Sequence, residues 1–260
     1  GDGDAIAETL TLTVAEYNQL VDTGEDATAL TTPYRIEDTA AAIEGQITAD
    51  GSLGALASAV SVTSTDTTFN FKVAEVNALN GATPPVTISG GYNITDTADA
   101  IENAFSDFIE QILIEAGTIA ISSGTAELTV NQYGMLEAAN NLADTGDFAI
   151  VDGPHEIDYG MVTFADVSQV TAMVETDGAD LTGLTELATN ATHIDLNGRN
   201  DVTLTVAQAG GGATPAVALV TNSGSYTIND TVAAIQSEID GQGTTVLAGA
   251  QVIYPIEDAT

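Results

Sequence analysis

The stretch Tyr226-Thr-Ile-Asn-Asp-Thr-Val232 sets the pattern from which the fold of this chain is predicted. The same pattern, Tyr-x-Ile-x-Asp-Thr followed by a small residue, occurs at 34–40 and at 92–98. Alternating Tyr and Ile place two apolar side chains on one face of a strand. Because Asp is a favoured helix N-cap, each stretch predicts a strand followed directly by a helix. The aspartates expected to cap these helices are Asp38, Asp96 and Asp230.

A second motif precedes the first at a nearly constant distance. It consists of an apolar residue, a polar residue and Val, followed by a short run that favours a helix. Its copies are Leu12–Asn18, Phe71–Asn77, Leu128–Gly134 and Leu204–Gly210. The third copy lacks a clear Tyr-x-Ile partner, yet Phe148–Gly153 stands where the spacing requires one, with Gly in place of Thr. A degenerate copy at the required position indicates an internal repeat.

A β-branched run after the helix of the Tyr-x-Ile motif predicts one further strand in each repeat. These runs are Ala59–Thr63, Thr118–Ser122, His193–Leu196 and Gln251–Tyr254. The predicted unit is therefore strand, short helix, strand, helix, strand. We predict an α/β repeat array, solenoid-like and β-rich, in which short capping helices cover the strands. An all-β arrangement of sandwich-like tandem domains is the alternative.

The motif spacing divides the chain into four segments, called repeats 1 to 4 below. They cover residues 1–68, 69–125, 126–201 and 202–260. Repeat 3 is longer than the others and carries an insertion at about 154–192, within which Glu175–Leu184 is rich in turn-forming residues. An insertion that breaks the repeat pattern is the expected place for a variable function.

The charge balance limits the partners of this chain. Its 260 residues include 3 Lys and Arg against 38 Asp and Glu, a formal net charge of -35 at pH 7. Such a chain cannot neutralise phosphates, so we expect no nucleic-acid partner and no anionic membrane partner. Self-repulsion on this scale has to be screened by high salt or by divalent cations. Calcium, held by oxygen ligands, is therefore the candidate cofactor.

One loop has the composition of a calcium site. In 195–201, oxygen-bearing side chains alternate around a Gly, as in the first half of a calcium loop, but the distal bidentate Glu is missing. An Asn-Gly hairpin between the flanking strands explains the same residues. Shorter acidic turns occur at 1–4, 144–147 and 177–180. The candidate metal ligands are Asp195, Asn197, Asn200, Asp201, Asp2 and Asp4.

No arrangement of residues predicts catalysis. The chain has no Cys, and neither His155 nor His193 stands in a pattern with a nucleophilic Ser or a second metal ligand. The aspartates of the Tyr-x-Ile-x-Asp motif recur in every repeat, whereas an active site needs one constellation. We therefore predict that this protein is not an enzyme.

The sequence was also searched for membrane-spanning and signal segments. No apolar run is long enough for a transmembrane helix, so no membrane insertion is expected. The stretch 1–4 lacks the basic and apolar regions of a signal peptide, so we expect a processed product or an excerpt of a longer chain.

Thr- and Ala-rich, Lys-poor units with a Val-x-Ala stretch followed by Tyr-x-Ile-x-Asp-Thr-Ala-x-x-Ile resemble repeat modules of large secreted bacterial surface proteins, of the S-layer and calcium-dependent adhesin kind. The resemblance covers nearly the whole chain and implies an extracellular, cell-surface location. The glycine-rich nonapeptide calcium repeats that often accompany such modules do not occur here in tandem.

The leading hypothesis is a structural protein that assembles with itself into a surface lattice, sheath or filament. The first and last strand candidates, 10–14 and 251–254, are apolar and offer edges for pairing with another chain. The alternative is an adhesin module that recognises a cell-surface glycan or a protein through the insertion of repeat 3.

Overall fold

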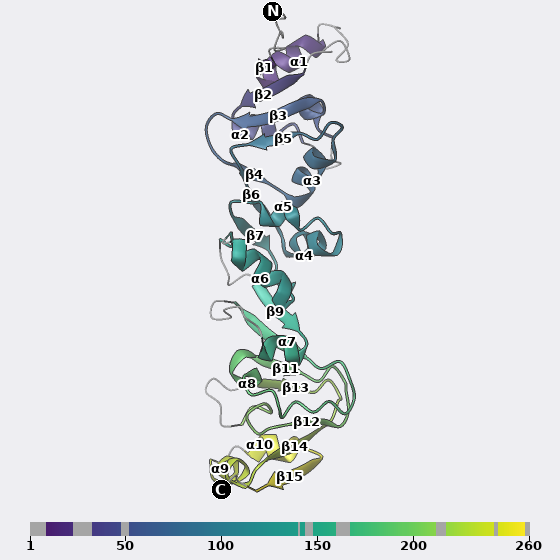
Figure 1. Cartoon of the computed structure of the whole chain (residues 1–260), viewed down its shortest axis with the longest axis vertical. Coiled ribbons are helices and arrows are strands. Elements are labelled where there is room, and N and C mark those ends of the chain that lie inside the picture. Colours follow the sequence, from purple (N-terminus) through teal and green to yellow (C-terminus); the bar gives the residue numbers. More distant parts are fainter. Residues whose placement is uncertain are drawn as a thin grey trace, which may run out of the picture. The chain divides into compact units, whose positions relative to one another are not determined.

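The structure, a computed structural model, describes residues 9–22, 33–47, 52–139, 141–143, 148–159, 167–211, 217–241 and 244–257. The chain folds into two compact units (Figure 1). The first comprises residues 1–124 with 139–144, and the second comprises residues 125–138 with 145–260. The boundaries of the four repeats remain a prediction.

In the first unit, two groups of strands and helices follow each other along the chain. The elements of repeat 1 are β1 (Leu10–Leu12), α1 (Val14–Asp22), β2 (Tyr34–Asp38), α2 (Ala40–Glu44), the 3-10 helix η2 (Gly54–Leu56) and β3 (Ala59–Ser64). Those of repeat 2 are β4 (Phe69–Phe71), α3 (Val73–Gly81), β5 (Thr87–Ser89), β6 (Tyr92–Thr97), α4 (Ala98–Ser106), α5 (Gln111–Ile114) and β7 (Ile119–Ser123).

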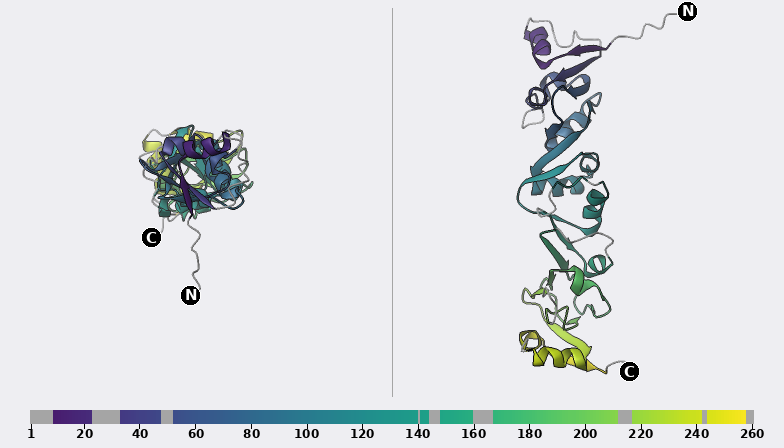
Figure 2. Two further views of the ribbon diagram at one scale, coloured as in Figure 1. Left: turned by 90° about the horizontal axis from the view of Figure 1, so that it is seen from above. Right: turned by 90° about the vertical axis from the view of Figure 1, so that its left-hand side faces the viewer.

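The elements of the second unit continue the alternation of strands and helices. Those of repeat 3 are β8 (Ala126–Leu128), α6 (Val130–Ala139), β9 (Phe148–Asp152), α7 (Pro154–Asp158), β10 (Gln169–Met173), α8 (Leu187–Asn190) and β11 (His193–Asp195). Those of repeat 4 are β12 (Val202–Leu204), β13 (Ala218–Val220), β14 (Tyr226–Thr231), α9 (Val232–Asp240), α10 (Thr244–Gly249) and β15 (Val252–Ile256). Within each unit the helices flank the strands (Figure 2).

All strand pairs within the sheets of the described residues are parallel. The sheet orders are β1-β2-β3-β5 and β4-β6-β7 in the first unit, and β13-β11-β10-β9-β8 and β12-β14-β15 in the second. Parallel neighbours need crossover connections, which the helices supply. The fold is therefore mixed α/β, and the all-β alternative is wrong.

The strand that carries the Tyr-x-Ile motif lies between the first strand and the next one in every sheet, and its register is constant. The motif Ile is opposite the apolar residue that opens the preceding motif; the pairs are Leu12 with Ile36, Phe71 with Ile94, Leu128 with Ile150, and Leu204 with Ile228. All four of these isoleucines are fully buried. The prediction that Tyr and Ile of the motif belong to the core is confirmed.

A strand from the following repeat extends three of these sheets. β5 of repeat 2 pairs with β3 of repeat 1, and β13 of repeat 4 pairs with β11 of repeat 3. Ile119 of β7 forms an isolated parallel bridge with Leu142. In each case the added segment lies between the first helix and the motif strand of its own repeat.

Repeat 3 departs from the prediction. The expected third strand at His193–Leu196 is present as β11, but β11 pairs with β10 and not with the motif strand β9. β10, which the sequence reading missed, takes the third position. The insertion therefore follows β10 and adds one strand to the sheet.

The predicted helix caps are wrong by one residue. The N-caps of α2, α4 and α9 are the threonines after the aspartates, Thr39, Thr97 and Thr231, whose hydroxyls accept from the N–H three residues on. The Thr is the N-cap because it, and not the Asp, is the last residue with an extended backbone before the helix begins.

The motif Asp instead joins the starts of two helices. In repeat 2, Oδ1 of Asp96 accepts from the N–H of Thr97 at 2.8 Å, and Oδ2 accepts from the N–H of Val73, the first residue of α3, at 3.0 Å. The same pair of bonds recurs in every repeat, from Asp38 to Val14, from Asp152 to Val130 and from Asp230 to Val206. In repeats 1 to 3 the positive N-termini of two helices lie around one carboxylate, because two adjacent parallel strands end at the same edge. The helix predicted after Leu204 is wrong, because residues 206–210 form a turn, and Asp230 joins this turn to the start of α9.

Removal of this carboxylate should destabilise the first unit. Asp96→Ala leaves the N–H groups of Val73 and Thr97 without their acceptor, which costs about 1–3 kcal/mol for a partly buried group. Urea unfolding followed by circular dichroism measures the loss.

Asp99→Ala is the matched control, because Asp99 lies exposed in the first turn of α4 and the substitution removes the same charge. Its loss should stay below about 1 kcal/mol, the scale of an exposed charge at a helix N-terminus. Equal losses for the two variants would contradict the bridging role of Asp96.

Candidate functional site

The motif tyrosines are anchors of the core. Each hydroxyl donates to a backbone carbonyl in the short helix that follows the second helix of its repeat. The bonds run from Tyr34 to Ala55 at 3.1 Å, from Tyr92 to Ile112 at 2.9 Å and from Tyr226 to Val246 at 2.7 Å. Burial, with the nearby Glu115 carboxylate, raises the pKa of Tyr92 to about 12, and burial also raises the pKa of Tyr34 and of Tyr226. These rings are therefore core residues whose hydroxyls are held by the backbone.

The oxygen ligands of the predicted calcium loop bind donors of the protein itself. Oδ1 of Asp195 accepts from the N–H of Asn197 at 2.7 Å, and both carboxylate oxygens accept from Nδ2 of Asn222 at 2.8 and 3.0 Å. Oδ1 of Asn200 accepts from the Ser225 hydroxyl at 3.3 Å. Within the part of the chain that the structure describes, no three His, Asp or Glu side chains form a metal-binding group.

Of the remaining metal candidates, the structure describes Asp201, at the end of this loop. Asp201 has a positive φ of 58°, and its N–H donates to the hydroxyl of Ser225 at 3.1 Å. Asp2 and Asp4 lie outside the described residues, as does the acidic turn at 144–147. Calcium binding stays a prediction.

The Asn-Gly hairpin is wrong, although the local turn is present. Asn197 and Gly198 have φ of 50° and 71°, and the N–H of Arg199 donates to the carbonyl of Leu196 at 2.8 Å. The strands on either side, β11 and β12, belong to different parallel sheets. A hairpin needs antiparallel neighbours, so the turn here redirects the chain from one sheet to the next.

Three polar turns lie side by side at this place. The N–H of Ser225, after the turn at 221–224, donates to the carbonyl of Arg199 at 3.0 Å. On the other side, the N–H of Gly178 in the insertion donates to the carbonyl of Asn200, and Asp177 accepts from the N–H of Asn200, both at 2.8 Å. The insertion therefore forms an exposed polar surface with the loop at 195–201.

The two histidines contact residues close by in sequence. The ring of His155 in α7 stacks on that of Tyr159, with 6.4 Å between centroids. Nδ1 of His193, the first residue of β11, lies 3.0 Å from the hydroxyl oxygen of Thr192. The prediction that the protein is not an enzyme is left open by these contacts.

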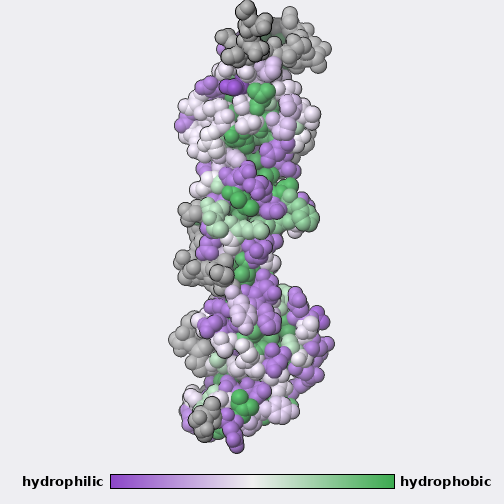
Figure 3. All heavy atoms as spheres, viewed as in Figure 1, coloured by the Kyte–Doolittle hydropathy of each residue, from purple (hydrophilic) through white to green (hydrophobic). Residues whose placement is uncertain are grey.

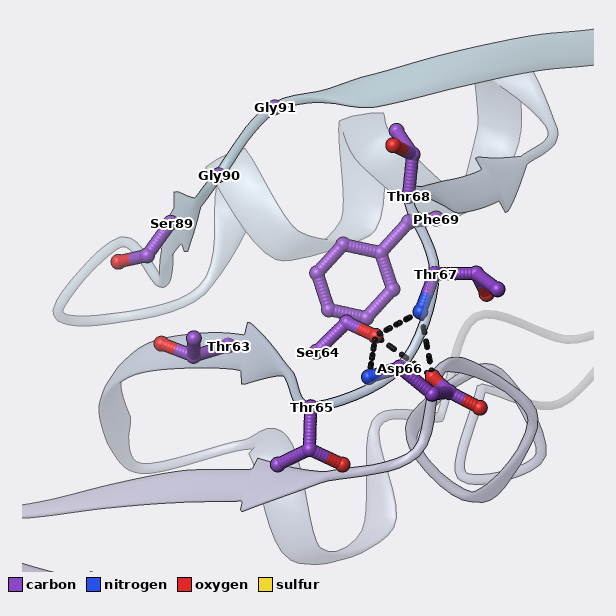
Figure 4. Close-up of a pocket in the computed structure, with 10 residues that line it drawn as sticks. All are labelled: Thr63, Ser64, Thr65, Asp66, Thr67, Thr68, Phe69, Ser89, Gly90 and Gly91. Carbon is purple, nitrogen blue, oxygen red and sulfur yellow. Dashed lines mark hydrogen bonds between the residues drawn. The ribbon is translucent and has the colours of Figure 1, made fainter.

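A pocket of about 260 Å³ lies between the β3–β4 and β5–β6 connections of the first unit (Figure 4). Its carboxylate, Asp66, accepts from the N–H of Ala40, the hydroxyl of Ser64 and the N–H of Thr67, at 2.8–2.9 Å. These hydrogen bonds, that of Ala40 first, lower the pKa of Asp66. The carboxylate of Asp66 therefore holds the start of α2 and the turn at 64–67 in place, and its role in this pocket is structural.

A second pocket, of about 510 Å³, lies between β13, β14 and α10 in the second unit. Small and apolar side chains line most of it, and the hydroxyl of Tyr226 is committed to Val246. The lining offers no charged group that would orient a ligand.

Two sets of exposed apolar side chains stand out. On the face shown in Figure 3, hydrophobic residues form small groups separated by hydrophilic ones. The first set consists of Leu10 in β1 with Leu20 and Val21 in α1. The second set consists of six exposed residues of α9 and β15: Val232, Ile239, Val252, Ile253, Tyr254 and Ile256. Ile253 lies on the opposite side of the strand from its neighbours. Exposed apolar side chains concentrated on terminal elements are typical of contact surfaces.

Comparisons with known proteins returned no match to a family model, to a curated protein or to a solved structure. Among the described residues, no helix has the length and apolar character needed to cross a membrane.

The tyrosine anchors generate a prediction. Tyr92→Phe removes the hydroxyl that donates to Ile112 and should cost about 1 kcal/mol, as for a buried hydrogen bond.

The buried hydroxyl of Tyr92 also makes the free energy of unfolding depend on pH in the alkaline range. An unfolded Tyr loses its proton near pH 10 and folded Tyr92 near pH 12, so in this window the unfolded chain binds fewer protons and stability falls as pH rises.

Urea titrations at pH 8 and pH 11 measure both effects. Tyr92→Phe should lose less stability between the two values than the unchanged protein does. Tyr159→Phe, whose ring is 71% exposed, is the control and should behave as the unchanged protein at both values. A pH dependence that Tyr92→Phe leaves intact would contradict the assignment.

Proposed function

We propose that this chain is an extracellular structural protein that assembles with itself into a surface lattice, sheath or filament. Its repeats would form a solenoid-like array, and contacts between strands or faces of neighbouring molecules would join the arrays. The single observation that carries the proposal is β15, a terminal strand whose five residues are all exposed and mostly apolar. An open parallel edge of this kind pairs readily with another chain.

The parallel sheets support the proposal. A strand from one repeat completes the sheet of the preceding repeat, as β5 does for β3 and β13 does for β11. Repeats that complete each other in this way do not close on themselves, and β15 lies at the open edge of its sheet. The resemblance to modules of secreted bacterial surface proteins points to the same role.

The net charge of -35 sets the conditions for assembly. Two such molecules repel each other at low ionic strength, and the repulsion must be screened by salt or bridged by divalent cations. We propose calcium as the bridging cation, on acidic surfaces of neighbouring molecules. This keeps a structural role for the acidic residues and assigns none of them to catalysis.

Assembly should therefore depend on ionic conditions. At low ionic strength the purified chain should sediment as a monomer. Extracellular calcium sites have dissociation constants of up to about 1 mM, so calcium added above that concentration should shift the chain to larger species in sedimentation velocity. EDTA at fixed ionic strength should reverse the shift.

High NaCl is the control, because about 1 M salt reduces the screening length to about 3 Å without bridging carboxylates. Assembly that forms in salt alone and ignores EDTA would remove calcium from the proposal. A chain that remains monomeric under every condition would contradict self-assembly.

The three polar turns keep the adhesin module as a second candidate. They expose Asp177 of the insertion, which accepts from the N–H of Asn200, and Asn222, which donates to Asp195. Deletion of the insertion is a poor test, because the carbonyl of Leu181 accepts from the buried amide of Gln208 at 2.7 Å. Asp177→Asn is milder, because it removes the charge of an exposed side chain and keeps an oxygen that can accept from the N–H of Asn200. Lost binding to cells or glycans with normal assembly would favour the adhesin module.

A further inference from the structure

We propose that the turn between α4 and α5 binds an arginine-rich segment of another protein, with the exposed ring of Phe108 at the centre of the contact. An arginine side chain of the partner stacks on this ring, and its charge is met by the carboxylates beside it. The turn belongs to the first unit (Figure 1). This binding function goes beyond the proposed self-assembly and does not depend on it.

Phe108 occupies a backbone position that usually belongs to glycine. α4 ends in a Schellman motif, in which the N–H of Ile109 donates to the carbonyl of Ala104 at 2.9 Å and the N–H of Phe108 donates to the carbonyl of Phe105 at 3.3 Å. The motif requires a left-handed backbone at Phe108, whose φ is 58°. Glycine adopts this conformation freely, whereas a bulky side chain is strained in it.

The ring of Phe108 adds little to the packing of the fold. It is 89% exposed, whereas Phe105, three residues earlier in α4, is buried and supplies the aromatic contact with the core. A strained backbone and an exposed apolar ring are both unfavourable for the chain on its own. A contact with a partner is therefore what accounts for a phenylalanine at this position.

The surroundings of the ring select a cation. Asp107, directly before the ring, is exposed, and Glu110 is half-buried with an Oε2 that has no hydrogen-bond partner among the described residues. The last turn of α4 contains no basic residue, so no side chain there compensates the negative end of the helix dipole. A donor with a positive charge would satisfy both the carboxylate oxygen and the helix end.

Arginine is the cation that fits these features together. The face of an aromatic ring attracts cations, and the planar guanidinium can stack on it, whereas the ammonium of lysine is a compact and strongly hydrated charge. The guanidinium also has five N–H donors, which pair with carboxylates in two parallel bonds. The ring and the two carboxylates can therefore be used by one arginine-rich segment at the same time.

A second copy of this chain is a poor source of that segment. The chain has 3 Lys and Arg against 38 Asp and Glu, so two copies repel each other. Its two arginines, Arg35 and Arg199, are far apart in the sequence, and the Nε of Arg199 is buried. The partner is therefore a different protein, and its basic segment is drawn to a net charge of -35.

A tetra-arginine peptide tests the inference. About 0.1 M NaCl without calcium limits attraction to carboxylates within a screening length of about 10 Å. In a nuclear magnetic resonance titration, the amide signals of residues 104–111 should shift first. A tetra-lysine peptide of the same charge should bind about two- to fivefold more weakly, because it lacks the stacking contribution.

Substitutions of Phe108 separate the ring from the charge. Phe108→Gly suits the left-handed backbone, so the urea midpoint should not fall, while binding of tetra-arginine should weaken at least about fivefold. Phe108→Leu keeps an apolar side chain without an aromatic face and should weaken binding to a similar extent. Tyr159→Leu is the matched control, because it removes an exposed ring outside this turn, and it should bind the peptide like the unchanged chain.

Three results would overturn the inference. Equal binding by the unchanged chain and Phe108→Gly would show that the peptide is held by diffuse attraction to the acidic surface. Phe108→Leu that binds like the unchanged chain would show that no cation is recognised by the ring. A lower urea midpoint for Phe108→Gly would show that the fold itself needs the ring.

The outcome is distinguishable from that of the proposed self-assembly. Peptide binding is measured without calcium, so a chain that stays monomeric in sedimentation velocity can still bind tetra-arginine. Phe108→Gly should assemble like the unchanged chain, and loss of assembly in this variant would place the ring in the contact between copies and overturn the arginine-rich partner.

Discussion

One carboxylate between two helix N-termini is the interaction on which the repeated architecture depends. Adjacent parallel strands end at the same edge, and in repeats 1 to 3 each leads into a helix, so two sets of free N–H groups meet there. Asp96 accepts from both sets, as Asp38 and Asp152 do, while Asp230 accepts from the start of α9 and from the turn after β12. Even repeat 3, where Gly153 replaces the capping Thr, keeps the bonds of Asp152. The carboxylate therefore fixes the first helix to the motif strand.

Short strands make each repeat dependent on its neighbour. Three-residue strands such as β4 bury few side chains, and the core grows as the next repeat adds a strand and a covering element. In three repeats the tyrosine hydroxyl holds the connection after the second helix by a hydrogen bond. In repeat 3 the equivalent residue is Phe148, which has no hydroxyl. In the described residues no further strand lies beside β15, and its Ile253 is 37% exposed.

The acidic surface and the apolar faces act at different ranges. Charge repulsion between two molecules extends over the screening length, whereas strand pairing and apolar contact require touching surfaces. In the proposed assembly, ionic conditions would decide whether molecules meet, and exposed apolar edges such as β15 would decide how they fit. The polar turns around Asn197 and Asn222 remain outside these faces.

The sequence by itself determined the elements and the core. The Tyr-x-Ile alternation and its spacing predict β2, β6, β9 and β14 and the burial of Ile36 and Ile94, because periodicity is a local property. Only the tertiary structure decided which side chain caps which helix, since the bond from Asp38 to Val14 joins residues 24 apart. It also decided that β10 takes the third position in repeat 3 and that 195–201 connects two sheets, because strand order depends on long-range pairing that no local pattern encodes.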